Sequence, residues 1–303
     1  MTSPEPVTER RAESGSDLDL RSTLELVELI NDEDALAAPA VRAVTPALAA
    51  AIDGIVERLE AGGRLLYAGA GSSGRLAAVD AAECGPTFGL APGRVQALVA
   101  GGASALAVAQ EEAEDDPRAA AADLSAVGVG PLDAVVVLSA SGSTPYALGA
   151  VRSARKARAL TVAVVCAEDS ELGQLAEHTV VALVGPEVIA GSTRMKAGTA
   201  QKLVLNTIST IAMVRLGRTY GNLMVEVVAS NAKLRARARR AVALAAGVDD
   251  EQAAAALEAA DGEVKVAIVT LLARIDAQAA RDRLIAAGGA VRQALEPDRV
   301  VPG

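Results

Sequence analysis

Two turns rich in glycine and serine each follow directly on a short, strongly apolar run. The first turn covers residues 69–75 (G-A-G-S-S-G-R), and the second covers residues 139–145 (S-A-S-G-S-T-P). Small residues let backbone N–H groups come close to an anion, and hydroxyls add further donors at a helix N-terminus. Two such turns, about 70 residues apart, predict a phosphate site built from two loops at one edge of a parallel sheet.

Five short apolar runs alternate with alanine-rich segments of helical length. Most of the runs are β-branched and apolar on both faces, which is typical of strands in a parallel sheet between two layers of helices. The runs are residues 64–69, 95–100, 134–139, 161–166 and 179–184. We expect an α/β fold, a three-layer αβα sandwich around a five-stranded parallel sheet, with right-handed connections.

The segments on either side of these runs indicate how the chain divides. Residues 1–20 are polar and predict a flexible N-terminal arm, residues 21–246 predict the main phosphate-binding domain, and residues 247–303 predict a small helical, UBA-like domain. Ser22 and Glu25 have the spacing of a capping box at the start of a helix. Further helices are expected at about 39–59, 194–216 and 222–244, followed by three or four short ones within 249–296.

Charge and aromatic content limit the partners that the surface can bind. The chain carries 29 basic and 38 acidic side chains, a net charge of −9, and it has no Trp, one Phe and three Tyr. An acidic surface without basic, aromatic stripes argues against binding to nucleic acid or to an anionic membrane. The first 20 residues lack the apolar core of a signal peptide, and no uncharged apolar run reaches 18 residues. We therefore expect a cytoplasmic protein with no nucleic-acid or membrane partner.

The chain has few residues from which to build other catalytic centres. Its one histidine, His178, stands at the entry to the last apolar run, at the sheet edge opposite the two turns. Ligands bind at the carboxyl ends of parallel strands, so within its own subunit His178 is expected to serve neither a Ser–His–Asp triad nor the ring opening of a sugar phosphate. One histidine and two distant cysteines, Cys84 and Cys166, make no zinc site. We expect neither a metal nor another cofactor.

Carboxylates and a cationic block remain as candidates for chemistry. Glu83 precedes Gly85–Pro86 and is expected at the end of the helix that starts at the first turn, and Glu114 lies in the acidic run 111–116. Each fits either a solvated surface position or a role in proton transfer. Residues 191–196 (G-S-T-R-M-K) fit either a helix cap followed by surface charges or a clamp for a phosphate or carboxylate.

Five stretches, taken together, resemble one known family. They are residues 69–76, 80–89, 140–146, 191–202 and 220–227. The family is that of the N-acetylmuramic acid 6-phosphate etherases, which belong to the sugar-isomerase (SIS) fold group, and the resemblance runs from about Thr8 to Leu295. The blocks E-C-G-P-T-F-G and G-S-T-R-M-K are its most specific parts. Three positions depart from the family pattern: Ser72 stands where Thr is frequent, Gly85 where Pro is usual and Ser143 where Arg is frequent. Because Ser143 replaces an arginine, one phosphate contact is expected to be missing or supplied elsewhere.

The resemblance implies a lyase that cleaves the D-lactyl ether of N-acetylmuramic acid 6-phosphate in the recycling of cell-wall sugars. The products are N-acetylglucosamine 6-phosphate and D-lactate, formed by elimination and water addition without a metal or redox cofactor. By the same resemblance, Glu83 is the general acid that protonates the departing lactate and then activates water, and Glu114 is the second acid–base residue. The removal of the C2 proton by Glu114 is our own hypothesis. The implied substrate-binding residues are Ser72, Ser73, Ser141, Thr144, Ser192, Arg194 and Lys196.

One geometric difficulty and one rival interpretation accompany this assignment. A regular helix from Gly74 puts Glu83 about 14 Å along the axis from the first turn, so either the helix is short or tilted or the site is shared across a subunit boundary. We expect a homodimer with the site near its interface, as the SIS resemblance also implies. The rival is a non-catalytic phosphosugar-sensing regulator of the glucokinase-regulatory-protein type, which needs phosphate binding but no acid pair.

Overall fold

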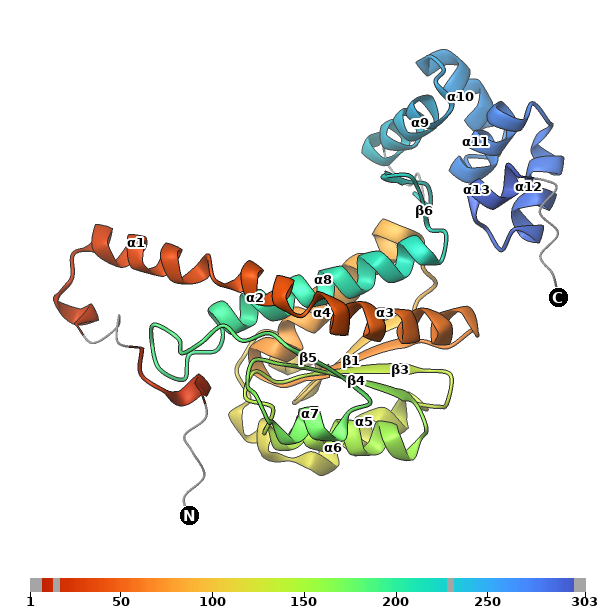
Figure 1. Ribbon diagram of the computed structural model, residues 1–303. Coiled ribbons are helices and arrows are strands. Elements are labelled where there is room, and N and C mark those ends of the chain that lie inside the picture. The colour runs from red at the N-terminus through yellow and green to blue at the C-terminus, as the bar shows by residue number, and fades with distance from the viewer. Residues whose placement is uncertain (1–6, 13–16, 228–231, 297–303) are drawn as a thin grey trace. The chain divides into compact units, whose positions relative to one another are not determined.

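The computed structural model describes residues 7–12, 17–227 and 232–296 (Figure 1). Its contacts divide the chain into two compact units, which are residues 1–82 with 93–209 and residues 83–92 with 210–303. The predicted arm, residues 1–20, lies partly outside the described residues. The predicted domain boundary at 246/247 falls inside the second unit and stays a prediction.

The first unit is built on the predicted five-stranded sheet. All neighbouring strands run parallel, in the order β2-β1-β3-β4-β5. The strands are β1 (Leu65–Gly69), β2 (Val95–Val99), β3 (Ala134–Leu138), β4 (Leu160–Val165) and β5 (His178–Val181). Each overlaps one of the predicted apolar runs, because a strand that is covered on both faces is apolar along most of its length.

The register of the central strands places the two Gly/Ser turns side by side. Gly69 at the end of β1 pairs with Leu138 at the end of β3, and the two turns begin at or directly after these residues. His178 is the first residue of β5 and pairs with Val162 of β4. The lone histidine therefore lies at the opposite edge of the sheet, as predicted.

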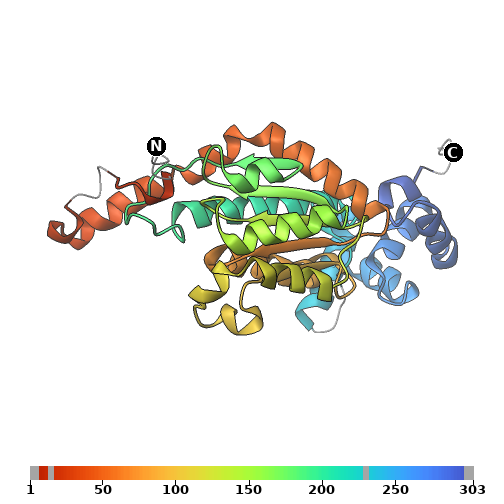
Figure 2. The same cartoon turned by 90° about the horizontal axis from the view of Figure 1, so that it is seen from below.

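Helices cover both faces of the sheet (Figures 1 and 2). On one face, α3 (Thr45–Glu60) packs against β3, β4 and β5, and on the other face α6 (Pro145–Lys156) packs against β1, β3 and β4. Beside α6 lie α5 (Pro117–Ala126) and α7 (Glu171–Leu175). Every residue of β1 and β3 is buried between these layers. The predicted three-layer α/β fold is confirmed.

The N-terminal helices follow the sequence with one difference. Ser22 caps α1 (Thr23–Asp34), and the predicted capping box forms. The single helix expected at 39–59 is instead two helices, α2 (Ala37–Ala43) and α3. The break has a local cause, because Pro46 in the first turn of α3 has no N–H to donate back to the preceding helix, and the backbone leaves the helical conformation at Val44.

Helix α1 contributes nothing to the core, since none of its residues is buried. A row of large apolar side chains on and beside it is exposed: Leu20, Leu24, Val27 and Ile30. Exposed apolar rows of this kind are typical of protein–protein contact surfaces. In the described part of the chain no single helix is long and apolar enough to cross a membrane, although residues 23–43 and 45–60 meet the length and composition test as a pair bent by 62°.

Two long helices contain residues of both units. They are α4 (Gly71–Phe88) and α8 (Lys196–Arg215). Helix α4 continues five residues beyond Glu83, where the sequence predicted its end. Pro86 lies in its last turn, where the missing N–H removes only one helical hydrogen bond. The described residues also include short 3₁₀ helices at η1 (Val7–Glu9), η3 (Leu18–Leu20), η4 (Gly102–Leu106) and η5 (Glu111–Asp115).

The second unit includes a short antiparallel ribbon where a helix was expected. β6 (Thr219–Tyr220) pairs with β7 (Leu223–Met224) across a two-residue turn. Gly221 in this turn has a φ of +57°, which glycine adopts without steric strain. The predicted start of a helix at residue 222 is therefore wrong. The helix in this region, α9, begins at Ala232 and ends at Ala246.

The predicted C-terminal helical bundle is present in the second unit. After α9 come α10 (Asp250–Ala259), α11 (Val264–Ala273), α12 (Ala277–Ala286) and α13 (Val291–Ala294). Their common core consists mainly of Ala and Val side chains, with two leucines and one isoleucine, and includes Val242 of α9. Helix α9 therefore packs as part of this bundle.

A partly buried ion pair joins the amino-terminal ends of β1 and β3. Arg64 donates from Nε and Nη2 to the two carboxylate oxygens of Asp133, at 3.0 and 2.7 Å, and the backbone amides of Arg64 and Gly130 donate to the same carboxylate. Burial alone raises the pKa of Asp133, but the hydrogen bonds from Arg64 and the two amides outweigh it and hold the pKa below its ordinary value.

Asp133→Asn is expected to destabilise the protein by about 2 kcal/mol at pH 7, between the values typical of surface and buried pairs. A carboxyl whose native pKa is lowered stabilises the fold above its unfolded pKa of about 4, and this stabilisation is lost as the pH falls through the native pKa. The difference between variant and wild type in urea unfolding should therefore shrink at pH 3. An equal difference at pH 7 and pH 3 would contradict this account.

Candidate functional site

The first Gly/Ser turn connects the end of β1 to the start of α4 with very close backbone packing. A Cβ added at Gly74 would lie 2.5 Å from the carbonyl oxygen of Gly69, so no larger residue fits there. Ser72 and Ser73 stand in the first turn of α4 and are half-buried. Backbone amides at a helix start and side-chain hydroxyls are the donors that an anion site uses, and binding of the phosphate here stays a prediction.

Gln201 of α8 supports this turn and was missed by the sequence analysis. Ser73 donates its hydroxyl hydrogen to Oε1 of Gln201 at 2.8 Å. Gln201 is 1% exposed, and among the described residues its Nε2 has no hydrogen-bond partner. The sequence held no signal for this contact, because 128 residues separate the two side chains.

The second Gly/Ser turn connects β3 to α6 and is held by its own hydroxyls. Ser139 accepts a hydrogen bond from the amide of Gly142 at 3.0 Å, and its hydroxyl lies 2.9 Å from that of Thr144. Ser143 donates from its amide and its hydroxyl to Oγ of Ser141, at 3.3 and 3.0 Å. Gly142 has a φ of +68°, and a Cβ there would lie 2.4 Å from Cβ of Ser170, so the turn requires glycine.

Glu114 lies directly beside the second turn. It belongs to η5, and the hydroxyl of Thr144 donates to its Oε1 at 3.0 Å. Glu114 as a residue is exposed, whereas Thr144 is only 9% exposed. The structure therefore brings together two residues that the sequence analysis selected for different roles, a carboxylate for proton transfer and a hydroxyl of the phosphate turn.

Glu83 has a different environment. It is exposed on α4, and in the described part of the chain no hydrogen bond or ion pair engages its carboxylate. Helix α4 is continuous from Gly71, so a rise of 1.5 Å per residue puts Glu83 about 18 Å along the axis from that end. The short helix that would have brought Glu83 close to the phosphate turn is therefore not what the described residues form.

The block 191–196 is organised by a glutamate that the sequence analysis did not select. The buried carboxylate of Glu187 accepts hydrogen bonds from the backbone amides of Lys196 and Ala197, at 3.2 and 2.9 Å, and so caps α8. The prediction that residues 191–193 cap α8 is therefore wrong, because the carboxylate of Glu187, from the preceding loop, binds the first backbone amides of the helix. The predicted ligand Ser192 is half-buried and Arg194 is exposed.

The ammonium group of Lys196 is buried and already engaged. It forms an ion pair with Glu33 of α1 and donates to the carbonyl oxygen of Pro186 at 2.8 Å, and the Lys196 side chain is 2% exposed. The same block also contacts the N-terminal segment, because the amide of Gly191 donates to the carbonyl oxygen of Thr8 at 3.0 Å. Residues from the predicted arm and from α1 thus hold this block in place.

Comparison with known proteins identifies the family. A family model described as the glucokinase regulatory protein N-terminal SIS domain matches residues 47–155. An N-acetylmuramic acid 6-phosphate etherase of Rubrobacter xylanophilus is 58% identical over 295 residues, which cover 97% of each chain. The chain belongs to the N-acetylmuramic acid 6-phosphate etherase family. The etherase of Streptomyces coelicolor is 54% identical over 92% of this chain and 90% of its own. A phosphoheptose isomerase of Francisella tularensis matches 64% of this chain and all of its own, with a TM-score of 0.49 and 21% identity.

A metal site or a reactive thiol would need particular arrangements of the described residues. Across 7–12, 17–227 and 232–296, no three His, Cys, Asp or Glu side chains are arranged to hold a metal ion. Both cysteines are buried, and burial together with the nearby carboxylate of Glu187 raises the pKa of Cys166 to about 12. Cys166 is therefore a neutral thiol near pH 7 and not a nucleophile.

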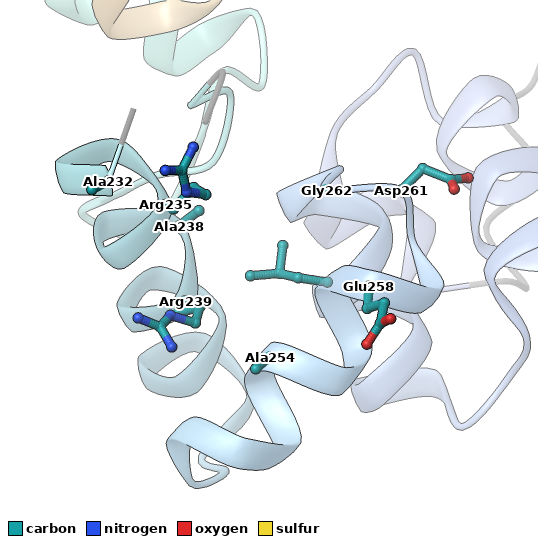
Figure 3. Close-up of a pocket in the computed structure, with 9 residues that line it drawn as sticks. Ala232, Arg235, Ala238, Arg239, Ala254, Glu258, Asp261 and Gly262 are labelled. Carbon is teal, nitrogen blue, oxygen red and sulfur yellow. The ribbon is translucent and has the colours of Figure 1, made fainter. Parts of the chain in front are cut away.

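A cavity of ≈ 550 Å³ lies in the C-terminal helical bundle of this chain (Figure 3). Arg235 and Arg239 of α9 line one wall, and Glu258 and Asp261 line the other. All four charged residues are exposed. None of the residues predicted to bind the substrate lines this cavity, so the candidate site rests on the two turns and not on the bundle.

Glu33→Gln is expected to destabilise the protein by about 3 kcal/mol, because it leaves the buried ammonium of Lys196 without its counter-charge. Lys196→Met combined with Glu33→Gln should restore most of that loss, because the double variant buries no unpaired charge. Urea unfolding of the two single variants, the double variant and the wild type measures the coupling. Losses that simply add would show that the pair does not stabilise the fold.

Proposed function

We propose that the chain is an N-acetylmuramic acid 6-phosphate etherase. It cleaves the D-lactyl ether of its substrate and forms N-acetylglucosamine 6-phosphate and D-lactate. The observation that carries the proposal is the hydrogen bond of Thr144 to Glu114, which puts a carboxylate beside the hydroxyl-rich turn at the strand ends. A phosphosugar sensor would need the turn but not the carboxylate. Identity of 58% to an etherase over nearly the whole chain supports the same activity.

The chemistry needs a phosphate anchor and two carboxyl groups in opposite protonation states. Ser72, Ser73, Ser141 and Thr144, with the backbone amides of the two turns, hold the 6-phosphate. In the open-chain sugar the aldehyde acidifies the proton on C2, and Glu114 takes that proton. Glu83 protonates the ether oxygen as the C3–O bond breaks and lactate leaves, and the pair of electrons from C2 forms the C2–C3 double bond. Glu83 then takes a proton from the water that adds at C3, and Glu114 returns its proton to C2.

The remaining predicted ligands lie in the block 191–196. The exposed guanidinium of Arg194 is proposed to bind the phosphate or the lactyl carboxylate, with the half-buried Ser192 beside it in the sequence. Lys196 remains a predicted ligand whose charge Glu33 already neutralises. An anionic group of the substrate would therefore bind more strongly to Arg194 than to Lys196.

We further propose that the enzyme is a homodimer in which Glu83 serves the site of the partner copy. Two observations support this: Glu83 is exposed about 18 Å along α4 from the first turn, and α1 exposes an apolar row. We also place the enzyme in the cytoplasm, in the recycling of cell-wall sugars, because its proposed substrate is a phosphorylated sugar.

Release of D-lactate from N-acetylmuramic acid 6-phosphate, assayed with and without a chelator, tests the proposed function. Equal lactate formation in both assays is the expected result. Binding of the phosphosugar in calorimetry without any lactate would instead favour the sensor of the glucokinase-regulatory-protein type and would reject the enzyme.

A further inference from the structure

The buried amide of Gln201 uses only its acceptor end. Ser73 donates its hydroxyl hydrogen to Oε1 of Gln201 at 2.8 Å. Gln201 is 1% exposed, and within the described ranges of the chain its Nε2 has no hydrogen-bond partner. A buried N–H group without an acceptor costs free energy, so such groups are rare in folded proteins. The amide of Gln201 therefore holds an unused donor beside a hydroxyl of the first Gly/Ser turn.

The two helices that carry Ser73 and Gln201 are also joined at a second point. Asp80 of α4 is buried, and its Oδ1 accepts hydrogen bonds from Nδ2 of Asn206 at 2.6 Å and from the hydroxyl of Ser209 at 3.0 Å, both on α8. This contact lies about two turns further along both helices, and all of these residues belong to the first unit. Because Asp80 already holds α4 against α8, the bond between Ser73 and Gln201 is not needed to keep the helices together.

The direction of the bond between Ser73 and Gln201 has to change when a phosphate binds. A hydroxyl has one hydrogen to donate, and Ser73 gives it to Gln201. A phosphate oxygen is an acceptor, so Ser73 must turn this hydrogen towards the phosphate, and Oε1 then loses its donor. A half-turn about the Cγ–Cδ bond of Gln201, a soft torsion, exchanges Oε1 and Nε2. Nε2 then donates to Oγ of Ser73, and Ser73 donates to the phosphate.

We propose that Gln201 is a positioning residue for Ser73, and that its amide reverses this hydrogen bond when the phosphate group of the substrate binds. The inference rests on the phosphate-binding role of Ser73 within the proposed function. Gln201 is too buried to contact the phosphate itself, so its effect passes through Ser73. Hydrogen bonds in a chain polarise one another, so a hydroxyl that accepts from an N–H is a better donor. An amide offers an acceptor to the free hydroxyl and a donor to the bound one.

The test asks whether Ser73 and Gln201 act together on phosphate binding. Gln201→Met keeps the length of the side chain and removes both its donor and its acceptor. We expect the calorimetric Kd for inorganic phosphate and KM for N-acetylmuramic acid 6-phosphate to rise about five- to tenfold, as the loss of one hydrogen bond implies, with kcat within about twofold. In the Ser73→Ala background the same change should alter Kd by less than about twofold. Thr199→Val, at an exposed position of the same helix, is the matched control with unchanged Kd and activity.

A second variant, Gln201→Glu, separates the donor from the acceptor. Its carboxylate accepts the hydrogen of Ser73 and has none to return, so the hydroxyl stays turned away from the phosphate. We expect a larger rise in Kd than in Gln201→Met. The double variant Ser73→Ala/Gln201→Glu measures the part of this rise that comes from repulsion between the carboxylate and the phosphate. If Gln201→Met does not fold, Gln201→Glu takes its place in the comparison, because it keeps the bond to Ser73 in the free protein.

The outcomes separate this inference from the proposed function. Equal rises in Kd with and without the Ser73 hydroxyl would overturn the inference, because Gln201 would then act through packing alone. An unchanged Kd would overturn it too, and coupling confined to the free energy of unfolding would make the pair a purely structural contact. Lactate release by the wild type reports on the enzyme independently. A wild type that shows the expected coupling in phosphate binding but releases no lactate would keep the inference and reject the etherase.

Discussion

Glu83→Gln is expected to stop the release of D-lactate while the C2 proton of the substrate still exchanges with solvent. Glutamine cannot protonate the ether oxygen, so the bond between C3 and oxygen stays intact and kcat falls by about 10²- to 10⁴-fold. Removal of the C2 proton depends on Glu114 and continues. Glu114→Gln should abolish both lactate release and exchange, because the first step no longer occurs.

Two measurements on the same samples separate the glutamates. A coupled assay follows D-lactate, and proton NMR in D₂O follows the loss of the C2 signal from N-acetylmuramic acid 6-phosphate. Glu112→Gln serves as the control, because Glu112 is exposed and stands two positions before Glu114 in the sequence. If Glu83→Gln kept near-normal lactate release, its assignment as the general acid would be wrong. Exchange that survived in Glu114→Gln would remove that residue from the C2 step.

Features that depend on local sequence were predictable. The five strands follow from apolar runs such as 134–139, whose residues are buried on both faces. The capping box at Ser22 requires only residues three positions apart. The two turns could be placed at one edge of the sheet because parallel strands end together, and the pairing of Gly69 with Leu138 confirms it.

Features that depend on distant partners were not predictable. Helix α8 looked capped by its own preceding hydroxyls, but Glu187, nine residues before Lys196, binds the first amides. The partner of Lys196 is Glu33, which lies 163 residues away, and a single sequence gives no sign of such a pair. The hydrogen bond between Thr144 and Glu114 is of the same kind, because it depends on how η5 packs against α6.

The local errors have local causes. The expected helix at 39–59 breaks because one proline, Pro46, outweighs a strongly helical pattern around it. The expected end of α4 at Glu83 came from reading Gly85–Pro86 as a stop, although a proline in the last turn leaves most of the hydrogen bonds intact. Because α4 continues past Glu83, this carboxylate lies on the helix well beyond the first turn, and its position bears on whether the site is shared between subunits.

Mixing two inactive variants tests whether Glu83 acts across a dimer interface. In a homodimer with shared sites, a dimer of one Glu83→Gln copy and one Glu114→Gln copy contains one site with both native glutamates and one site with neither. Random exchange in a one-to-one mixture makes about half of the dimers mixed, and each mixed dimer has one working site of two, so about one quarter of the wild-type rate should return. Each variant alone should remain inactive.

The design of the mixture decides between a shared and a self-contained site. The two variants carry different affinity tags and are co-expressed, so that mixed dimers can be purified and their composition checked. A mixture of Glu83→Gln with the Glu83→Gln/Glu114→Gln double variant is the control, because no arrangement of those chains places both native glutamates in one site. Recovered activity in the first mixture alone would assign Glu83 to the partner's site. No recovery from verified mixed dimers would mean that each chain uses its own Glu83 together with its own Glu114.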